Sequence, residues 1–185
     1  MNDIFYANLG QCSMEIKQYE KDNNADRKNE IFEVIDLILT TSNLARKEGL
    51  LALEEFANGD SLQDGVKSFF RDIILLIVDG TAPDLLDTIV SMRYQANGFT
   101  DYDALQILMF WWGALSIQAG ENPIIIETGL CAMLPDKVAE EYRSIKAAKE
   151  EERRKQAKIK QEGAKKSGSG FLTREEVMAL LSSIG

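Results

Sequence analysis

Histidine is absent from this sequence of 185 residues, and cysteine occurs only twice. The missing imidazole removes Ser-His and Cys-His nucleophile pairs, together with the most frequent zinc ligand. Cys12 and Cys131 lie far apart and without metal-type spacing, which is typical of reduced, buried thiols in a cytosolic protein. The acidic candidates Asp79, Asp84 and Glu121 stand at turns where helix capping accounts for them, and no phosphate loop accompanies them. We therefore expect no enzyme, no cofactor and no metal site.

Long apolar runs are also lacking. The N-terminus has no basic start followed by an apolar run, so we expect no signal peptide. The most apolar stretches are "IILLIV" at 73–78 and "ILMFWWGALSI" at 107–117. Both fall well short of the ~20 residues that a membrane-spanning helix needs. The sequence thus predicts a cytoplasmic chain that is not transmembrane.

Charge is distributed unevenly along the chain. Residues 143–166 hold ten Lys or Arg against four Glu, a net charge of +6, whereas residues 1–142 carry −14. An acidic body argues against nucleic-acid binding, because phosphate neutralisation needs a basic surface on the fold itself. The basic segment is either a solvated charged helix or a contact for an acidic partner or an anionic membrane surface.

Apolar periodicity predicts an all-α fold, a bundle of long and short helices with an extended charged C-terminal helix. "IILLIV" has no polar gap and also fits a buried strand, but the pattern before it favours a helix. Trp111 and Trp112 are expected to be core aromatics. The expected helices cover 30–57, 62–78, 81–96, 100–120, 124–135 and a final stretch from 136 to about 163.

Four segments follow from these patterns. Residues 1–142 form the body, 143–162 a charged helical stalk, 163–170 ("GAKKSGSG") a flexible linker, and 171–185 a short amphipathic peptide. In the peptide Thr173 and Glu176 make a capping box. Its apolar residues Val177, Leu180, Leu181 and Ile184 share one face. So short a helix on a tether cannot bury that face alone, so we expect it to dock on something.

A glycine interrupts the stretch "LARKEGLLALEEF" at 44–56. Glycine inside a helix costs roughly 1 kcal/mol relative to alanine. Gly49 falls near the apolar stripe of the expected helix 30–57, with Ala45 and Ala52. We therefore expect it to permit close helix packing that a larger side chain would prevent by overpacking.

Three stretches, in order, resemble the cytoplasmic part of the MotA family of flagellar stator subunits (MotA/TolQ/ExbB type). They are "ARKEGLLALEE" at 45–55, "IILLIVDGTAPDLL" at 73–86 and "GALSIQAGENPIIIETGLCAMLP" at 113–135. The resemblance implies torque transfer to the rotor protein FliG, and its rotor-facing arginine and glutamate fall on Arg46 and Glu54. On one continuous helix these two residues would lie about 12 Å apart along the axis and partly on the same side.

The chain also departs from that family. Only thirty-nine residues separate Gly80 from Gly120, where the family carries two membrane helices, so ion conduction is not expected. Ile124 stands where the family usually has an arginine. The retained part is the interaction domain without its membrane helices.

The C-terminal "FLTREEVMALLSSIG" resembles the N-terminal motif of the switch protein FliM, which binds phosphorylated CheY. Arg174 and Met178 replace the polar and acidic residues that are usual in that motif. The expected partner-binding residues of this peptide are Leu172, Glu176, Val177, Leu180 and Leu181.

Two hypotheses for function follow from the sequence. The first is a soluble flagellar-motor accessory protein at the cytoplasmic face of the motor. Its MotA-like domain would contact a FliG-like rotor protein or stator subunits, and its tethered peptide a CheY-like response regulator or a switch component. The second is a structural helical bundle whose C-terminal helix docks on its own body. Deletion of residues 167–185 separates the two.

Overall fold

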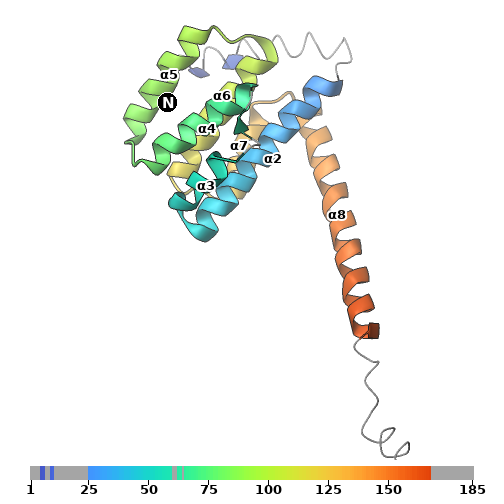
Figure 1. Ribbon diagram of the computed structural model, residues 1–185. Helices are drawn as coiled ribbons and strands as arrows, with labels where there is room; N and C mark the ends of the chain where they lie inside the picture. Colours follow the sequence, from blue (N-terminus) through green and yellow to red (C-terminus); the bar gives the residue numbers. More distant parts are fainter. Residues whose placement is uncertain (1–4, 7–8, 11–24, 60–61, 64, 168–185) are drawn as a thin grey trace, which may run out of the picture. The chain divides into compact units, whose positions relative to one another are not determined.

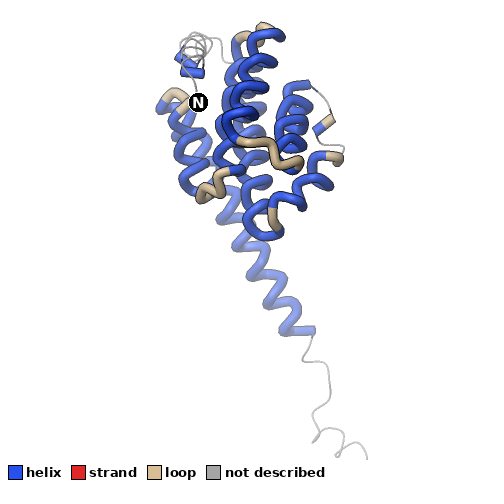
Figure 2. The backbone as a smooth tube through the Cα atoms, turned by 90° about the vertical axis from the view of Figure 1, so that its left-hand side faces the viewer, coloured by secondary structure: helices blue, strands red, loops and turns tan. Residues whose placement is uncertain are grey.

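The structure is a computed structural model that describes residues 5–6, 9–10, 25–59, 62–63 and 65–167. Within these residues the regular secondary structure is helical, with no strand (Figure 2). This confirms the predicted all-α class. The chain divides into two compact units, Met1–Ala139 and Glu140–Gly185. The first unit thus ends three residues before the predicted end of the body at 142.

The first unit is a bundle of helices joined by short turns (Figure 1). "IILLIV" lies in the second half of α4, so the helical interpretation is confirmed and the strand alternative is wrong. The elements are α2 (Ala25–Glu48), the 3₁₀ helix η2 (Leu50–Ala52), α3 (Leu53–Ala57), α4 (Gly65–Val78), α5 (Pro83–Asn97), α6 (Asp101–Gln118) and α7 (Pro123–Ala132), and α8 (Asp136–Ser167) begins at the end of this unit.

Helix α6 is the centre of the bundle. Its side chains are buried on every side, which is expected only for a helix surrounded by other elements. Phe110 stacks on Phe70 of α4, with 4.6 Å between ring centroids. Trp111 is fully buried, as predicted, and its indole Nε1 donates a hydrogen bond of 2.8 Å to Asp87 Oδ1 of α5. Trp112 is only partly buried.

Two glycines let helices approach closely. A Cβ on Gly113 of α6 would lie 2.7 Å from Cγ2 of Ile38 on α2. A Cβ on Gly129 of α7 would lie 2.1 Å from the ring of Trp112 on α6. Such distances are too short for real carbon contacts, so α2 and α7 pack on α6 at this spacing because these two positions lack a side chain.

Helices α2, α4 and α6 run in the same direction. At their starts, Arg27 of α2 pairs with Asp103 of α6 at 3.1 Å, and Lys67 of α4 with Glu33 of α2 at 3.2 Å. The short turns after α4 and α6 reverse the chain, so α5 and α7 run back the other way (Figure 1). The ends of the three parallel helices therefore meet at one end of the bundle.

The prediction of one helix over 30–57 is wrong, because the chain breaks at Gly49. There φ is 91° and ψ is 166°, a conformation essentially restricted to glycine. The expected packing role is also wrong: Gly49 is exposed, and a Cβ built on it meets nothing within 4 Å. The glycine serves to turn the chain from α2 into η2 and α3.

In the second unit, α8 is a polar helix. Ile145 and Ile159 are exposed, and Lys155 pairs with Glu151 one turn earlier at 2.8 Å. The helix continues to Ser167, so the first five residues of the predicted linker, 163–167, are helical. Helix propagation costs little once a long helix exists, which explains why a glycine at 163 does not end it. The remaining linker residues and the peptide at 171–185 lie outside the described residues.

Across the described ranges, no helix combines the length and the apolar character that crossing a bilayer requires. Cys131 is buried, as predicted, and Cys12 lies outside the described residues.

Candidate functional site

The three stretches that carry the family resemblance come together at one end of the first unit. Arg46, in the last turn of α2, donates from Nη1 to the backbone oxygens of Gly120 and Glu121, at 3.1 and 3.4 Å. Gln118, at the end of α6, donates from Nε2 to the backbone oxygen of Thr81 at 2.7 Å. These bonds connect the end of α2, the turn after α4 and the turn after α6. Residues separated by more than seventy positions thus meet at one site.

The turns "DGTAP" and "AGENP" are built in the same way. After α4, Gly80 N–H bonds to Ile77 O at 3.0 Å and Thr81 N–H to Leu76 O at 3.0 Å. Gly80 has φ of 76°, so the pattern is the Schellman motif, in which a left-handed glycine ends a helix. Pro83 then occupies the first turn of α5, where its missing N–H is no loss.

After α6 the same geometry recurs. Gly120 has φ of 73°, its N–H bonds to Ile117 O at 3.0 Å, and Glu121 N–H bonds to Ser116 O at 3.0 Å. Asn122 caps α7 by accepting from Ile124 N–H at 2.9 Å, and Pro123 follows. The glycine and proline of both motifs, and the asparagine of the second, are therefore explained by helix ends and helix starts. Three of the four residues of "GENP" are therefore explained by the end of α6 and the start of α7.

Arg46 joins the end of α2 to the turn after α6. The carbonyl ends of α2 and α6 both lie beside it, and a cation at a helix C-terminus is stabilised by the unpaired carbonyl groups there. Both of its hydrogen bonds use Nη1. Among the described residues, Nε and Nη2 of Arg46 have no partner, and the side chain is exposed. Arg46 can therefore hold the turn and still contact another molecule.

Glu54 lies in the first turn of α3, beyond the Gly49 break, and is exposed. The expectation that Arg46 and Glu54 share one helix, about 12 Å apart along its axis, is wrong because they belong to different helices. Neither residue is buried, so both remain accessible. The other predicted partner-binding residues, Leu172, Glu176, Val177, Leu180 and Leu181, lie outside the described residues.

Apolar side chains are exposed at the same end. Leu51 of η2 is 74% exposed, and Ile124 at the start of α7 is 70% exposed. We call Arg46, Leu51, Glu54 and Ile124 the turn face. The break at Gly49 leaves Leu51 exposed on η2. Ile124 was recognisable beforehand, as the apolar residue at a position where the family usually has arginine.

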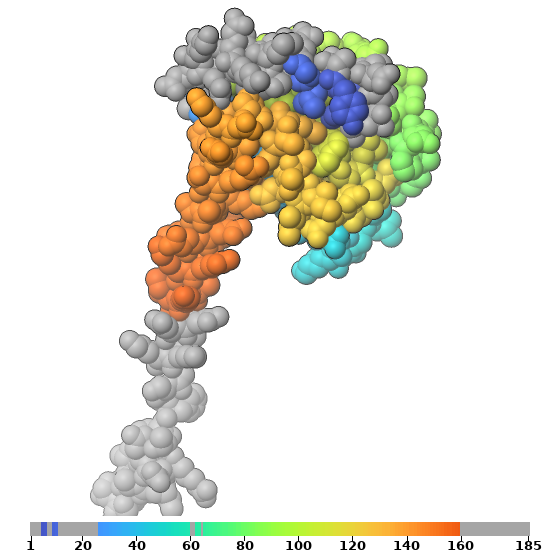
Figure 3. All heavy atoms as spheres, turned by 180° about the vertical axis from the view of Figure 1, so that it is seen from behind, coloured from blue at the N-terminus to red at the C-terminus, as the bar shows by residue number. Residues whose placement is uncertain are grey.

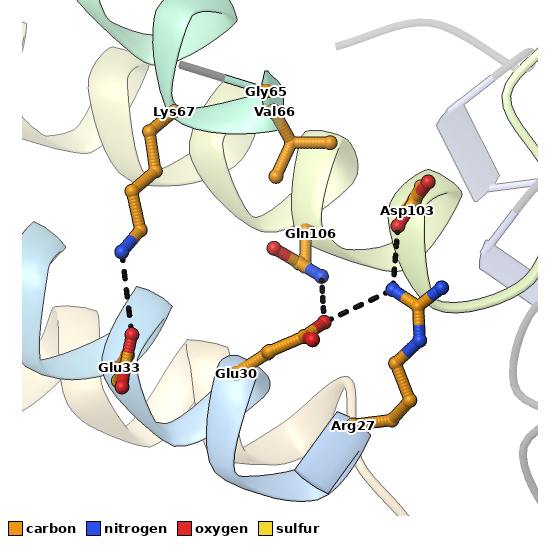
Figure 4. A pocket seen from close by; sticks show the side chains of 8 residues that line it. All are labelled: Arg27, Glu30, Glu33, Gly65, Val66, Lys67, Asp103 and Gln106. Atoms are coloured by element: carbon orange, nitrogen blue, oxygen red, sulfur yellow. Dashed lines mark hydrogen bonds and ion pairs between the residues drawn. The ribbon is translucent and has the colours of Figure 1, made fainter. Parts of the chain in front are cut away.

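A second candidate is an open groove of about 400 Å³ between the starts of α2, α4 and α6 (Figure 4). Arg27 pairs with Glu30 at 3.0 Å and with Asp103 at 3.1 Å, and Gln106 donates to Glu30 at 3.4 Å. The hydrogen bond from Arg27 to Glu30 is the main cause that raises the pKa of the Arg27 guanidinium, and the charge of Glu30 adds to it. The charges in the groove thus satisfy one another and bind three helices together.

Neither place offers a metal site: the described residues contain no group of three His, Cys, Asp or Glu side chains suited to hold a metal ion. In the groove, ion pairs and a hydrogen bond connect the starts of α2, α4 and α6. The turn face, in contrast, combines an accessible cation, an accessible carboxylate and exposed apolar side chains. That combination suits contact with another protein.

The described residues are all-α, and the first unit is a helical bundle with the turns after α4 and α6 at one end. Comparison with known proteins adds no family to this description. No protein-family model, no curated protein and no solved structure matches the chain.

Proposed function

We propose that this chain is an accessory protein of the flagellar motor, acting at the cytoplasmic face of the motor. Its first unit contacts a FliG-like rotor protein, or stator subunits, through the turn face. Its C-terminal peptide docks on a CheY-like response regulator or a switch component.

The observation that carries the proposal is the joint location of the three MotA-like stretches. They are far apart in the sequence, yet hydrogen bonds from Arg46 and Gln118 connect them at one end of the bundle. Turn geometry explains their glycines and prolines, but it does not require Arg46, Glu54 and two large apolar residues to be exposed there. A contact surface for a rotor protein accounts for that exposure.

The chemistry of the turn face also suggests how such a contact is stabilised. Charges at the rim of an interface act mainly on association rate and orientation, whereas buried apolar anchors supply most of the affinity. Leu51 and Ile124 are the apolar anchors of this surface, and Arg46 and Glu54 set the orientation. At the position of Ile124, where the family usually has an arginine, this chain therefore offers an apolar contact in place of a charged one.

The direct test is binding of the purified full chain to a purified FliG-like rotor protein. We expect Glu54→Lys to weaken binding at least tenfold, and Ile124→Ser to weaken it several-fold. Glu55→Lys is the matched control, because it makes the same charge change on the neighbouring exposed residue. Equal loss with both lysine variants, or no loss with either, would contradict a specific contact through Glu54.

A separate test concerns the tail. Deletion of residues 167–185 should abolish binding to a response regulator while leaving both rotor binding and the melting temperature unchanged. A lowered melting temperature with unchanged partner binding would favour the alternative, in which the C-terminal helix docks on its own body. A pull-down from motile cells that recovers no rotor, stator or chemotaxis component would remove the motor proposal altogether.

A further inference from the structure

Helix α5 carries an apolar stripe that faces away from the bundle. Leu85 is 54% exposed and Met92 is 64% exposed, Ala96 is exposed, and Ile89 is half-buried. Their spacing of four, three and four residues places all four within about 60° of the helix circumference. The opposite side of α5, with Leu86, Val90 and Tyr94, is buried. Figure 3 shows this segment, in green, at the outer edge of the first unit.

The stripe is also free of charge. Asp87 accepts from the indole of Trp111, and Arg93 pairs with Asp72 of α4 at 2.7 Å while its guanidinium lies over the Phe69 ring. Both charged side chains are thereby engaged by residues of α4 and α6. Only Asp84, at the start of the helix, is charged and exposed on α5. Single exposed apolar residues are ordinary, but an aligned charge-free stripe in a chain with 28% charged residues needs an explanation.

We propose that this stripe is a self-association surface, on which α5 of a second copy of the chain packs antiparallel. The spacing is that of a coiled-coil seam, in which apolar side chains of one helix insert between those of the other. This inference goes beyond the proposed motor function and does not depend on it.

The antiparallel arrangement makes the stripe complementary to itself. A two-fold axis between residues 90 and 91 sets Leu85 opposite Ala96, and Ile89 opposite Met92. Each large side chain at the ends of the stripe then meets a small one. A parallel pair would set Ala96 against Ala96, which leaves a gap, and would bring the two Asp84 carboxylates together. The antiparallel pair keeps these carboxylates about 20 Å apart.

Charge restricts where two copies can touch. Residues 1–142 carry −14, so two bodies repel each other at long range. A charge-free stripe is where they can touch without desolvating carboxylates. Since salt screens the repulsion and leaves apolar contact intact, the association should strengthen as salt rises, unlike one held by ion pairs.

The contact is small. A helix of 15 residues is about 22 Å long, and packing two of them buries on the order of 700 Å² in total. This is below the size of stable interfaces, so we expect a reversible dimer with a dissociation constant on the order of 100 µM.

Sedimentation of the full chain at rising concentration tests the dimer. We expect the wild type to shift from monomer toward dimer between about 10 and 500 µM, and more strongly in 0.5 M than in 0.05 M salt. Met92→Glu should weaken dimerisation at least tenfold. Leu51→Glu is the matched control, since it places the same charge on another exposed apolar residue, on the turn face. A monomer throughout, or equal loss with both variants, would overturn the proposal.

Disulfide trapping tests the register. Leu85→Cys and Ala96→Cys chains are prepared separately, each with Cys12 replaced by serine and Cys131 retained because it is buried. An antiparallel pair predicts that mild oxidation links the two variants when mixed, at least tenfold more than either alone, because identical positions lie about 16 Å apart along the axis. Cross-linking of each variant with itself, without cross-linking in the mixture, would overturn the antiparallel arrangement.

Discussion

Replacement of Gly49 by alanine and by leucine distinguishes backbone strain from crowding at the break between α2 and η2. Gly49 has φ of 91° and ψ of 166°. A residue with a Cβ is destabilised by about 1–3 kcal/mol in this conformation. Alanine also lowers the entropy of the unfolded chain, and this stabilises the folded state by about 0.4–1 kcal/mol. With the middle of each range, the net destabilisation by Gly49→Ala is about 1.3 kcal/mol.

Leucine should cost nearly the same as alanine. A Cβ at Gly49 meets nothing within 4 Å, and the position is exposed, so a larger side chain finds open space. We expect the two variants to differ by less than about 0.5 kcal/mol. Overpacking, in contrast, would add about 1–3 kcal/mol for leucine alone.

Thermal unfolding followed by circular dichroism measures both variants. For a unit of this size, 1 kcal/mol corresponds to roughly 3–4 °C, so each variant should melt about 4–5 °C lower than the wild type. Glu48→Ala, a change at the neighbouring exposed position, is the control and should shift the midpoint by under about 2 °C. An unchanged or raised midpoint with increased helicity in Gly49→Ala would refute the argument, because it would mean that α2 continues without strain.

Variants at four further positions probe helix packing, a buried hydrogen bond and a helix end. Gly113→Ala and Gly129→Ala should each destabilise the first unit by about 1–3 kcal/mol in urea unfolding, because the added methyl group overlaps a neighbouring helix. Asp87→Ala should cost about 1–3 kcal/mol, since it leaves the buried indole N–H of Trp111 without its acceptor. Gly98, with φ of 58° and ψ of 44°, ends α5 in the left-handed region that asparagine tolerates. We expect Gly98→Asn to be less destabilising than Gly98→Ala by several tenths of a kcal/mol.

The controls for these variants differ in kind. For the two packing glycines, serine should cost about as much as alanine, and a neutral result for both substitutions would show that α6 and its neighbours can separate freely. For Asp87, asparagine retains an acceptor and should recover part of the loss. Equal stability of the Asn and Ala variants at Gly98 would argue against the left-handed helix end.

Much of the helical pattern was predictable because its boundaries are local. A glycine in the left-handed conformation ends one helix, and a proline three residues later starts the next; both residues are visible in "DGTAP" and "AGENP". The helical state of "IILLIV" was likewise recoverable from the apolar periodicity before it. These features depend on a few neighbouring residues, so no knowledge of the rest of the chain is needed.

The role of each glycine was not predictable in the same way. Sequence reasoning assigned close packing to Gly49, yet that role belongs to Gly113 and Gly129, and Gly49 instead breaks the helix. A glycine in an apolar stripe fits either role. The role depends on whether another helix lies opposite the glycine. Gly113 faces Ile38 of α2, which is far away in the sequence, whereas none of the described residues lies opposite Gly49.

The candidate site was likewise predictable only in part. Arg46 and Glu54 were identified from a resemblance, but their placement on different helices depends on the backbone at Gly49, and the exposure of Leu51 follows from that break. The sequence by itself determined the all-α class, the helix-ending turns and the uneven charge, because these follow from composition and local conformational preference. Only the tertiary structure decided that the end of α2 and the turns after α4 and α6 are joined at one end of the bundle, and that the apolar stripe of α5 faces outward. Both depend on which faces the helices bury against α6, and that choice is made by the packing of the whole bundle.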